Sequence, residues 1–178
     1  MSYSISLYLV DMDKLEQHVG SGDEDFLARV VENNPEEMDE EEEDDEDDEL
    51  TLKGAVDQLI LGGDKDPEEA HQYGYALLEF CDTLGESAPV GDGGEANWQT
   101  VEDSGLAKLF EQSGPPVPLL PSDDFPTIGH VRHAKISAAL SGLEDDELDA
   151  DAEDLRDDFI AAAKKAQQEG LDLILFYF

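Results

Sequence analysis

The sequence predicts an α+β fold with a small sheet that includes both terminal strands. Ser2–Val10 alternates in part, with Tyr3, Ile5, Leu7 and Leu9 on one face, as in a half-buried strand. Leu171–Phe178 is apolar on both faces, which is typical of a central strand. Most of the chain between them carries helical spacing, so strands and helices are segregated rather than alternating. We therefore expect the two terminal strands to pair with each other.

The first half of the chain predicts four helices. Two short helices are expected at Asp11–Gly20, where Asp11 or Asp13 can cap the start, and at Asp23–Glu32, which has an apolar face. A third helix covers Thr51–Leu61, whose apolar residues form one stripe along the helix, and Gly62 and Gly63 end it. Asp66-Pro67-Glu68-Glu69 is a strong helix start, and this fourth helix should continue to Leu84.

The second half is less regular. We expect a Gly-rich loop at Glu86–Asn97, a short apolar helix at Leu106–Phe110 and a proline-rich extended stretch at Pro115–Pro126. A short strand at Thr127–His133 and a short helix at Ala134–Leu140 should follow. The acidic segment Leu143–Glu153 begins a long helix that continues to Glu169 and ends at Gly170.

Residues 36–49 form an acidic run in which Met38 is the only residue that is not Asp or Glu. Like charges repel and little apolar surface offsets the ordering entropy, so we expect a flexible insertion. The chain has 178 residues, which suits one domain over residues 1–178.

The net charge of −37 restricts the partners. Without the thirteen acids of the run, 34 acids and 10 basic residues remain, so the rest still carries −24. Direct binding to nucleic acid or an anionic membrane is electrostatically opposed, while a basic protein is favoured. Adaptation to a salty cytoplasm is an alternative explanation of the dispersed acids.

The location expected is the cytoplasm. Cys81 is the only cysteine, which excludes an internal disulfide and favours a reducing compartment. We identify neither a signal peptide nor an apolar run long enough to span a membrane. The sequence leaves the oligomeric state open.

The acidic run supplies the candidate residues for binding a basic partner: Glu40, Glu41, Glu42, Glu43, Asp44 and Asp45. Mimicry of DNA phosphate is an alternative, and Glu144–Asp158 suits it better because a helix would fix the spacing of its acids. Specific Ca²⁺ binding would need a loop Gly and a closing Glu, which the acidic segments lack. We expect no metal site and no cofactor.

A second candidate site surrounds the one basic cluster of the sequence. His130 and Arg132 would share a strand face with His133 opposite, and Lys135 follows closely. With Trp98 from the Gly-rich region, these residues are the candidates for a pocket holding an anionic group. Pairing with internal carboxylates, and for Trp98 an anchoring role, are the alternatives. A metal on the two histidines lacks a nearby third ligand.

No catalytic constellation is recognisable. Cys81 lies on the apolar stripe of its helix, which favours core packing over nucleophilic chemistry. Gly91–Gly94 lacks the Lys and the preceding strand of a phosphate loop. We therefore expect no catalytic residues and no enzymatic activity.

Three segments of the chain have patterns that are familiar from another family. They are LKGAVDQLILGG at Leu52–Gly63, IGHVRHAKISAAL at Ile128–Leu140, and the final helix, Gly break and apolar terminus at Asp154–Phe178. In these segments the chain resembles the YfbM-like family of uncharacterised bacterial proteins. The acidic insertion and the proline-rich stretch depart from that pattern. The resemblance implies a compact bacterial α+β domain and transfers no functional residue.

Our leading hypothesis is a non-catalytic interaction protein whose acidic surface engages a basic partner, for example as an immunity-type protein that blocks a toxin. The alternative is a small-ligand binder or enzyme with a pocket near His130 and His133.

Overall fold

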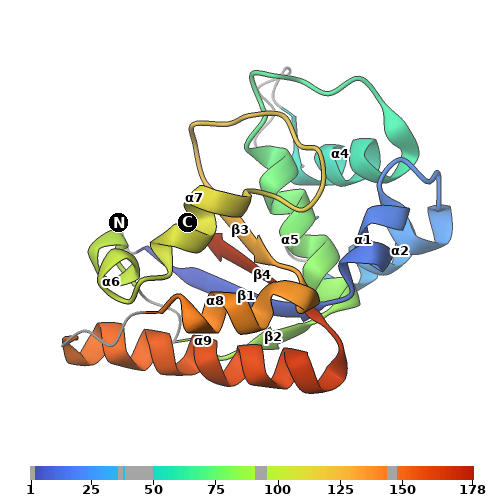
Figure 1. Cartoon of the computed structure of the whole chain (residues 1–178). Coiled ribbons are helices and arrows are strands. Elements are labelled where there is room, and N and C mark those ends of the chain that lie inside the picture. The colour runs from blue at the N-terminus through green and yellow to red at the C-terminus, as the bar shows by residue number, and fades with distance from the viewer. Residues whose placement is uncertain (1–2, 36–37, 39–49, 91–95, 144–147) are drawn as a thin grey trace. The chain divides into compact units, whose positions relative to one another are not determined.

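The computed structural model describes residues 3–35, 38, 50–90, 96–143 and 148–178 (Figure 1). The chain divides into two compact units, which we describe separately. The first contains residues 1–12, 86–116 and 127–178, and the second contains residues 13–85 and 117–126. The expectation of one domain over residues 1–178 stays a prediction.

The first unit is built on a four-stranded antiparallel sheet. Its order is β2-β1-β4-β3, with strands at Ile5–Val10 (β1), Glu86–Ala88 (β2), Thr127–Val131 (β3) and Asp172–Tyr177 (β4). The predicted pairing of the terminal strands is confirmed, with a register that runs from Ile5 opposite Tyr177 to Val10 opposite Asp172. The predicted α+β fold class is confirmed as well.

Strand β4 is central and buried on both faces, as its apolar sequence predicts. Leu173 and Leu175 point to one face and Ile174 and Phe176 to the other, and none of the four is more than 1% exposed. On the Phe176 face, the ring of Tyr8 meets Phe176 edge-on at 6.0 Å between centroids. Burial on both faces explains why this segment lacks polar alternation.

Four α-helices and one 3₁₀ turn are described in the first unit: α6 (Trp98–Asp103), α7 (Ala107–Ser113), η3 (His133–Lys135), α8 (Ile136–Ser141) and α9 (Ala150–Glu169). Asp149 caps α9 by accepting from the backbone N–H of Ala152, and Gly170 ends it at φ 73°. Figure 1 shows α8 beside α9 on one side of the sheet, where α9 contacts β1 and β4.

The second unit is helical among its described residues. It holds most of α1 (Met12–His18), with α2 (Glu24–Asn33), α4 (Leu52–Asp57), the π-helical segment η2 (Gln58–Gly62) and α5 (Gln72–Leu84). The side chains of Phe26, Leu59, Ile60, Tyr73 and Phe80 form its core. Backbone N–H groups of Gly20 and Gly22 donate to the carbonyls of Leu59 and Ile60, which ties the π-helical segment to the chain after α1.

One helix start was predicted wrongly. The sequence places the start at Asp66-Pro67, whereas α5 begins at Gln72. The Asp66 carboxylate accepts from the N–H of Glu68 two residues later, and the N–H of Asp66 donates to the Tyr73 hydroxyl. These bonds hold Asp66 in a separate turn before the helix.

The predicted loop at Glu86–Asn97 was also wrong in part, because Glu86–Ala88 forms β2. Helix α6 then starts at Trp98, where no helix was predicted. The predicted flexible insertion at 36–49 lies outside the described residues except for Met38. That side chain is 2% exposed.

Candidate functional site

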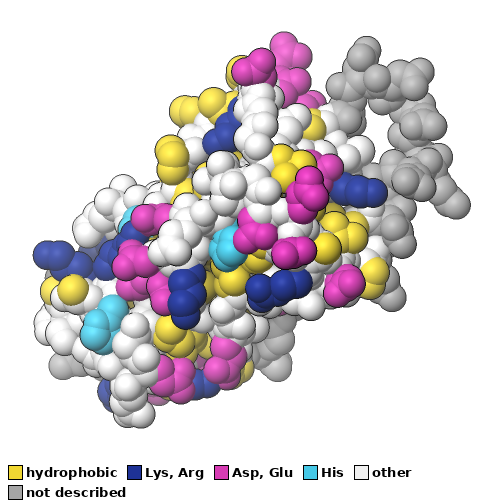
Figure 2. Space-filling view, turned by 90° about the vertical axis from the view of Figure 1, so that its right-hand side faces the viewer, with side chains coloured by type: hydrophobic (Ala, Val, Ile, Leu, Met, Phe, Trp, Pro, Cys, Tyr) yellow, Lys and Arg dark blue, Asp and Glu magenta, His cyan; other side chains and the backbone are white. Residues whose placement is uncertain are grey.

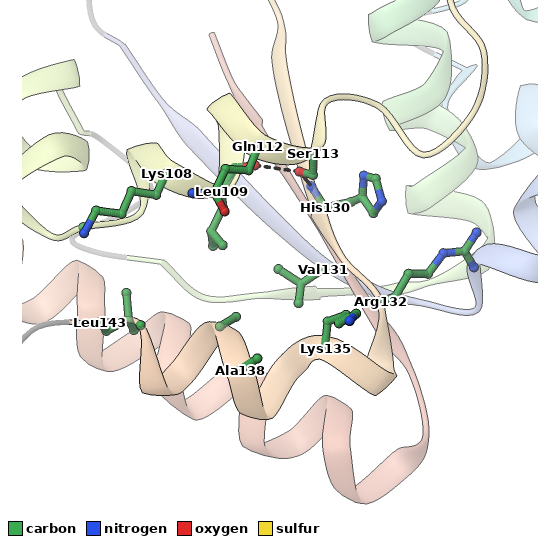
Figure 3. A pocket seen from close by; sticks show the side chains of 13 residues that line it. Lys108, Leu109, Gln112, Ser113, His130, Val131, Arg132, Lys135, Ala138 and Leu143 are labelled. Carbon is green, nitrogen blue, oxygen red and sulfur yellow. Dashed lines mark hydrogen bonds between the residues drawn. The ribbon is translucent and has the colours of Figure 1, made fainter.

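A cavity of about 510 Å³ lies within the first unit, between α7, the edge strand β3 and α8 (Figure 3). We call it the α7–α8 cavity. Its lining comes from three places: Gly105, Lys108, Leu109, Gln112 and Ser113 from α7 and the turn before it; His130, Val131 and Arg132 from β3 and the residue after it; and Lys135, Ala138, Ala139, Gly142 and Leu143 from α8 and its flanks.

A close helix–strand contact forms the β3 side of the α7–α8 cavity. A Cβ atom at Gly129 would lie 3.0 Å from the carbonyl oxygen of Leu109, so glycine lets α7 approach β3. The backbone N–H of His130 donates to the Ser113 hydroxyl oxygen at 2.8 Å, and that hydroxyl donates to the Leu109 carbonyl. The last turn of α7 is thus fixed to the strand.

The cavity is positively charged in a strongly acidic protein. Three of the ten Lys and Arg residues line it, namely Lys108, Arg132 and Lys135, with His130 beside them. No Asp or Glu occurs among the described residues that line it. Between the charged groups the surface is apolar: Val131 is buried, and Leu109, Ala139 and Leu143 are half-buried.

Arg132 is held by a carboxylate at the end of the sheet. Its Nη1 lies 3.6 Å from Oδ2 of Asp172. The same carboxylate accepts from the backbone N–H groups of Met12 and His133, at 3.0 and 2.6 Å. Asp172 therefore joins β4 to α1 and to the chain leaving β3, and it partly neutralises Arg132.

The histidines of the predicted pocket have different surroundings. Nδ1 of His130 lies 2.8 Å from the carbonyl oxygen of Gly114, so Nδ1 carries the proton. The side chains of His130 and of Arg132, which directly follows β3, point to the side opposite that of Val131 (Figure 3). His133 does not line the cavity; its Nε2 lies 3.3 Å from the Gln167 carbonyl of α9.

Trp98 also lies away from the α7–α8 cavity. Its ring centroid is 5.8 Å from that of Phe110 and 5.0 Å from that of Tyr177, and its Nε1–H donates to Glu102. Burial raises the pKa of the neighbouring Tyr177, and the nearby Tyr3 adds to this shift. Of the four candidate ligand residues, the structure places His130 and Arg132 at one cavity and the other two elsewhere.

Sequence reasoning missed Lys108, Leu109 and Gln112 as lining residues. Lys108 and Leu109 lie in the helix predicted at Leu106–Phe110, and Gln112 lies just beyond it, in the last turn of α7. The apolar pattern gave no reason to single them out. Lys135 was noted as a neighbour of the histidines but was not assigned to the site. The only available signal was the spacing of Lys108 and Gln112, which places them on one helix face.

A second cavity of about 170 Å³ lies between β2 and α9. Its lining includes Glu86 and Asp158 as well as Lys165, so its charges are mixed. Lys165 donates to the Glu86 carboxylate, and this hydrogen bond and the negative charge raise the pKa of Lys165. That lysine is therefore already neutralised, which makes this cavity a poorer anion site.

The candidate partner residues Glu40, Glu41, Glu42, Glu43, Asp44 and Asp45 lie outside the described residues. Acidic side chains are nevertheless plentiful where the structure is described. Asp151, Glu153, Asp154 and Asp157 are exposed on α9. In Figure 2, Asp and Glu side chains are scattered over the face that is shown, with Lys, Arg and His between them.

The remaining described residues include one thiol and no further candidate site of this kind. Cys81 is buried, and burial raises the pKa of its thiol well above the ordinary value. In the described parts of the chain, His, Cys, Asp and Glu side chains nowhere gather in threes around a potential metal position. None of the described helices combines the length and apolar character that crossing a bilayer requires.

Fold and site together define an α+β protein with a cationic, apolar-floored cavity beside an edge strand. The chain belongs to the family described as domain of unknown function DUF7691, whose match covers residues 1–178. No curated protein and no solved structure matches the chain. The YfbM-like resemblance, and with it a bacterial origin, stays a prediction.

Proposed function

We propose that this protein binds a small anionic ligand in the α7–α8 cavity without catalysing its conversion. The observation that carries the proposal is the lining: Lys108, Arg132 and Lys135 contribute positive charge, and no acid occurs among the described lining residues. In a chain of net charge −37, most cations are expected to face carboxylates, so a cavity lined this way favours a foreign anion.

The size and floor of the cavity support a ligand with an apolar body. A volume of about 510 Å³ lies in the range of small-molecule sites. Val131, Leu109 and Leu143 would cover apolar parts of the ligand, while the lysines at the rim hold its charge. Hydrophobic contact supplies affinity, and charge supplies orientation.

The test is a titration of the ¹⁵N-labelled chain with octanoate, followed by NMR, in about 0.15 M salt so that distant acids are screened. Amide shifts are expected in α7, β3 and α8. Lys135→Gln should weaken binding about three- to fivefold, as expected for one partly exposed ion pair. Lys164→Gln is the matched control, because Lys164 is exposed on α9 and does not line the cavity.

Two results would contradict the proposal. One is the absence of any saturable shift with octanoate. The other is an equal loss of affinity in Lys135→Gln and Lys164→Gln, which would mean that octanoate responds to total charge rather than to this cavity.

The second candidate is an interaction protein of the cytoplasm, whose acidic surfaces engage a basic partner as an immunity protein engages a toxin. The exposed acids of α9 favour it, since Asp151, Glu153, Asp154 and Asp157 occupy successive turns. The same charge opposes direct binding to nucleic acid.

A pull-down from host lysate tests this second candidate at low and moderate salt. The intact chain is compared with a chain lacking residues 36–49 and with the variant Asp151→Asn/Asp154→Asn/Asp157→Asn. A basic protein retained by the intact chain, lost in either variant and released by salt is expected. Retention that is indifferent to salt and to both changes would exclude charge as the cause.

A further inference from the structure

We infer that the ligand of the α7–α8 cavity is a two-headed anion: an apolar chain with a carboxylate at each end. This inference rests on the proposed function and specifies the class of ligand. It follows from where the two lysines of the cavity lie relative to its apolar floor.

The two lysines stand at opposite ends of the α7–α8 cavity. In Figure 3, Lys108 lies with Leu143 at one end, and Lys135 lies towards the other end, beside Arg132. Gly105 also lies at the first end, since an added Cβ there would lie 3.6 Å from Leu143 Cδ2. Helix α8 lies between Lys135 and Leu143, and its 6 residues rise about 9 Å.

The space between the two ends is mainly apolar, although Gln112 and Ser113 also line the cavity. It is bordered by Leu109 from α7, Val131 from β3 and Ala139 from α8. A sugar or a nucleoside would place hydroxyl groups against these side chains and lose their hydrogen bonds with water. A methylene chain has no such cost, so the floor favours a linear aliphatic body.

Both lysines have charge available for a ligand. Among the described residues, neither Lys108 nor Lys135 forms a salt bridge, whereas Arg132 lies 3.6 Å from the Asp172 carboxylate. A single-headed anion would use the Lys135 end, where the remaining charge of the partly neutralised Arg132 adds to that of Lys135, and leave Lys108 in water. A second carboxylate would engage Lys108 as well.

The experiment is isothermal titration calorimetry with three probes in about 0.15 M salt. Suberate has two carboxylates on a long chain, octanoate has one on a chain of the same length, and succinate has two on a short chain. Suberate is expected to bind about three- to fivefold more tightly than octanoate, the gain of one partly exposed ion pair, and succinate most weakly.

The variants separate the two ends. Lys108→Gln should lower the affinity for suberate to that for octanoate and leave octanoate unchanged. Lys135→Gln should weaken both. The control Lys164→Gln should change neither, which excludes a general effect of charge.

The possible failures are distinguishable. Equal binding of suberate and octanoate, with Lys108→Gln affecting neither or both, would overturn the two-headed ligand and leave the anion site intact. Succinate binding as tightly as suberate would overturn the span between the ends. If no probe binds and NMR shows no saturable shift, the anion site itself is excluded.

Discussion

At the scale of single residues, Gly129 determines how closely α7 approaches the sheet. A side chain there would meet backbone atoms: the carbonyl oxygen of Leu109 at 3.0 Å and Cα of Phe110 at 3.1 Å. Backbone atoms cannot rotate away as the end of a flexible side chain can. The separation of α7 from β3, and with it the wall of the α7–α8 cavity, depends on this position having no Cβ.

Gly129→Ala is therefore expected to destabilise the protein by about 1–3 kcal/mol, the usual cost of overpacking. Urea unfolding followed by circular dichroism measures the change. Gly142→Ala is the control, because the nearest atom to its added Cβ, the carbonyl oxygen of Ala139, would lie 3.4 Å away, in ordinary contact. Equal midpoints for the two variants would show that α7 adjusts without cost.

At the scale of elements, the short helix α6 is held at its end by a side chain from α9. Arg156 is 9% exposed, and its Nε–H donates to the carbonyl oxygen of Ser104 at 2.7 Å, with Nη2 3.4 Å from the carbonyl of Asp103. Those carbonyls lie at the C-terminal end of α6. The guanidinium group thus does for this helix what a capping residue does elsewhere.

Replacement of Arg156 by Met keeps much of the side-chain volume and removes the donors. The variant is expected to lose about 1–3 kcal/mol in the free energy of unfolding, because buried carbonyl groups lose a partner. Lys164→Met, on the exposed side of the same helix, should stay within about 0.5 kcal/mol of the parent. An unchanged urea midpoint for Arg156→Met would mean that water replaces the guanidinium group.

The elements with long apolar patterns could be predicted from sequence, while those fixed by tertiary contacts could not. β4 and α9 carry strong local signals: β4 appears close to its expected range, and α9 ends at Glu169 as expected but begins at Ala150 rather than at Leu143. β2 has only three residues and becomes a strand because β1 lies beside it. Asp66 and Pro67 show the reverse case, since a strong local start signal gave way to the bond from Asp66 to Tyr73.

Only part of the candidate site could be predicted from the sequence, for the same reason. The sequence pattern predicts that His130 and Arg132 share a side of β3, since alternation is local. The pattern does not predict that Lys108 and Lys135 line the same cavity. They do so because α7 packs against Gly129 of β3 and the chain continues from β3 into α8. Nor can the pattern show that Arg132 is already held by Asp172.

At the scale of the whole molecule, charge opposes compaction. The formal net charge of −37 is carried by 47 acids against 10 basic residues. Folding brings these acids closer together than they are in an expanded chain, so their mutual repulsion subtracts from stability. Ion pairs such as Lys165–Glu86 and Arg132–Asp172 offset part of this repulsion.

Potassium chloride should therefore raise the melting temperature. Between about 0.01 and 1 M salt the screening length falls from about 30 Å to about 3 Å, which removes most of the repulsion between separated acids. Differential scanning calorimetry over this range is the measurement, with sucrose as an uncharged control for solvent exclusion. A melting temperature that stays constant or falls as salt is added would show that repulsion between the acids does not destabilise the folded protein.

The pairing of β1 with β4 also means that the sheet cannot be completed until the end of the chain has been synthesised. The hydrogen bond between Met12 and Asp172 joins residues 160 positions apart. A ribosome that adds about 5–20 residues per second leaves β1 without its central neighbour for roughly 8–30 seconds. During this time the apolar strand β1 is exposed to chaperones and to strands of other nascent chains. The same charge repulsion that destabilises the folded protein keeps these nascent chains apart.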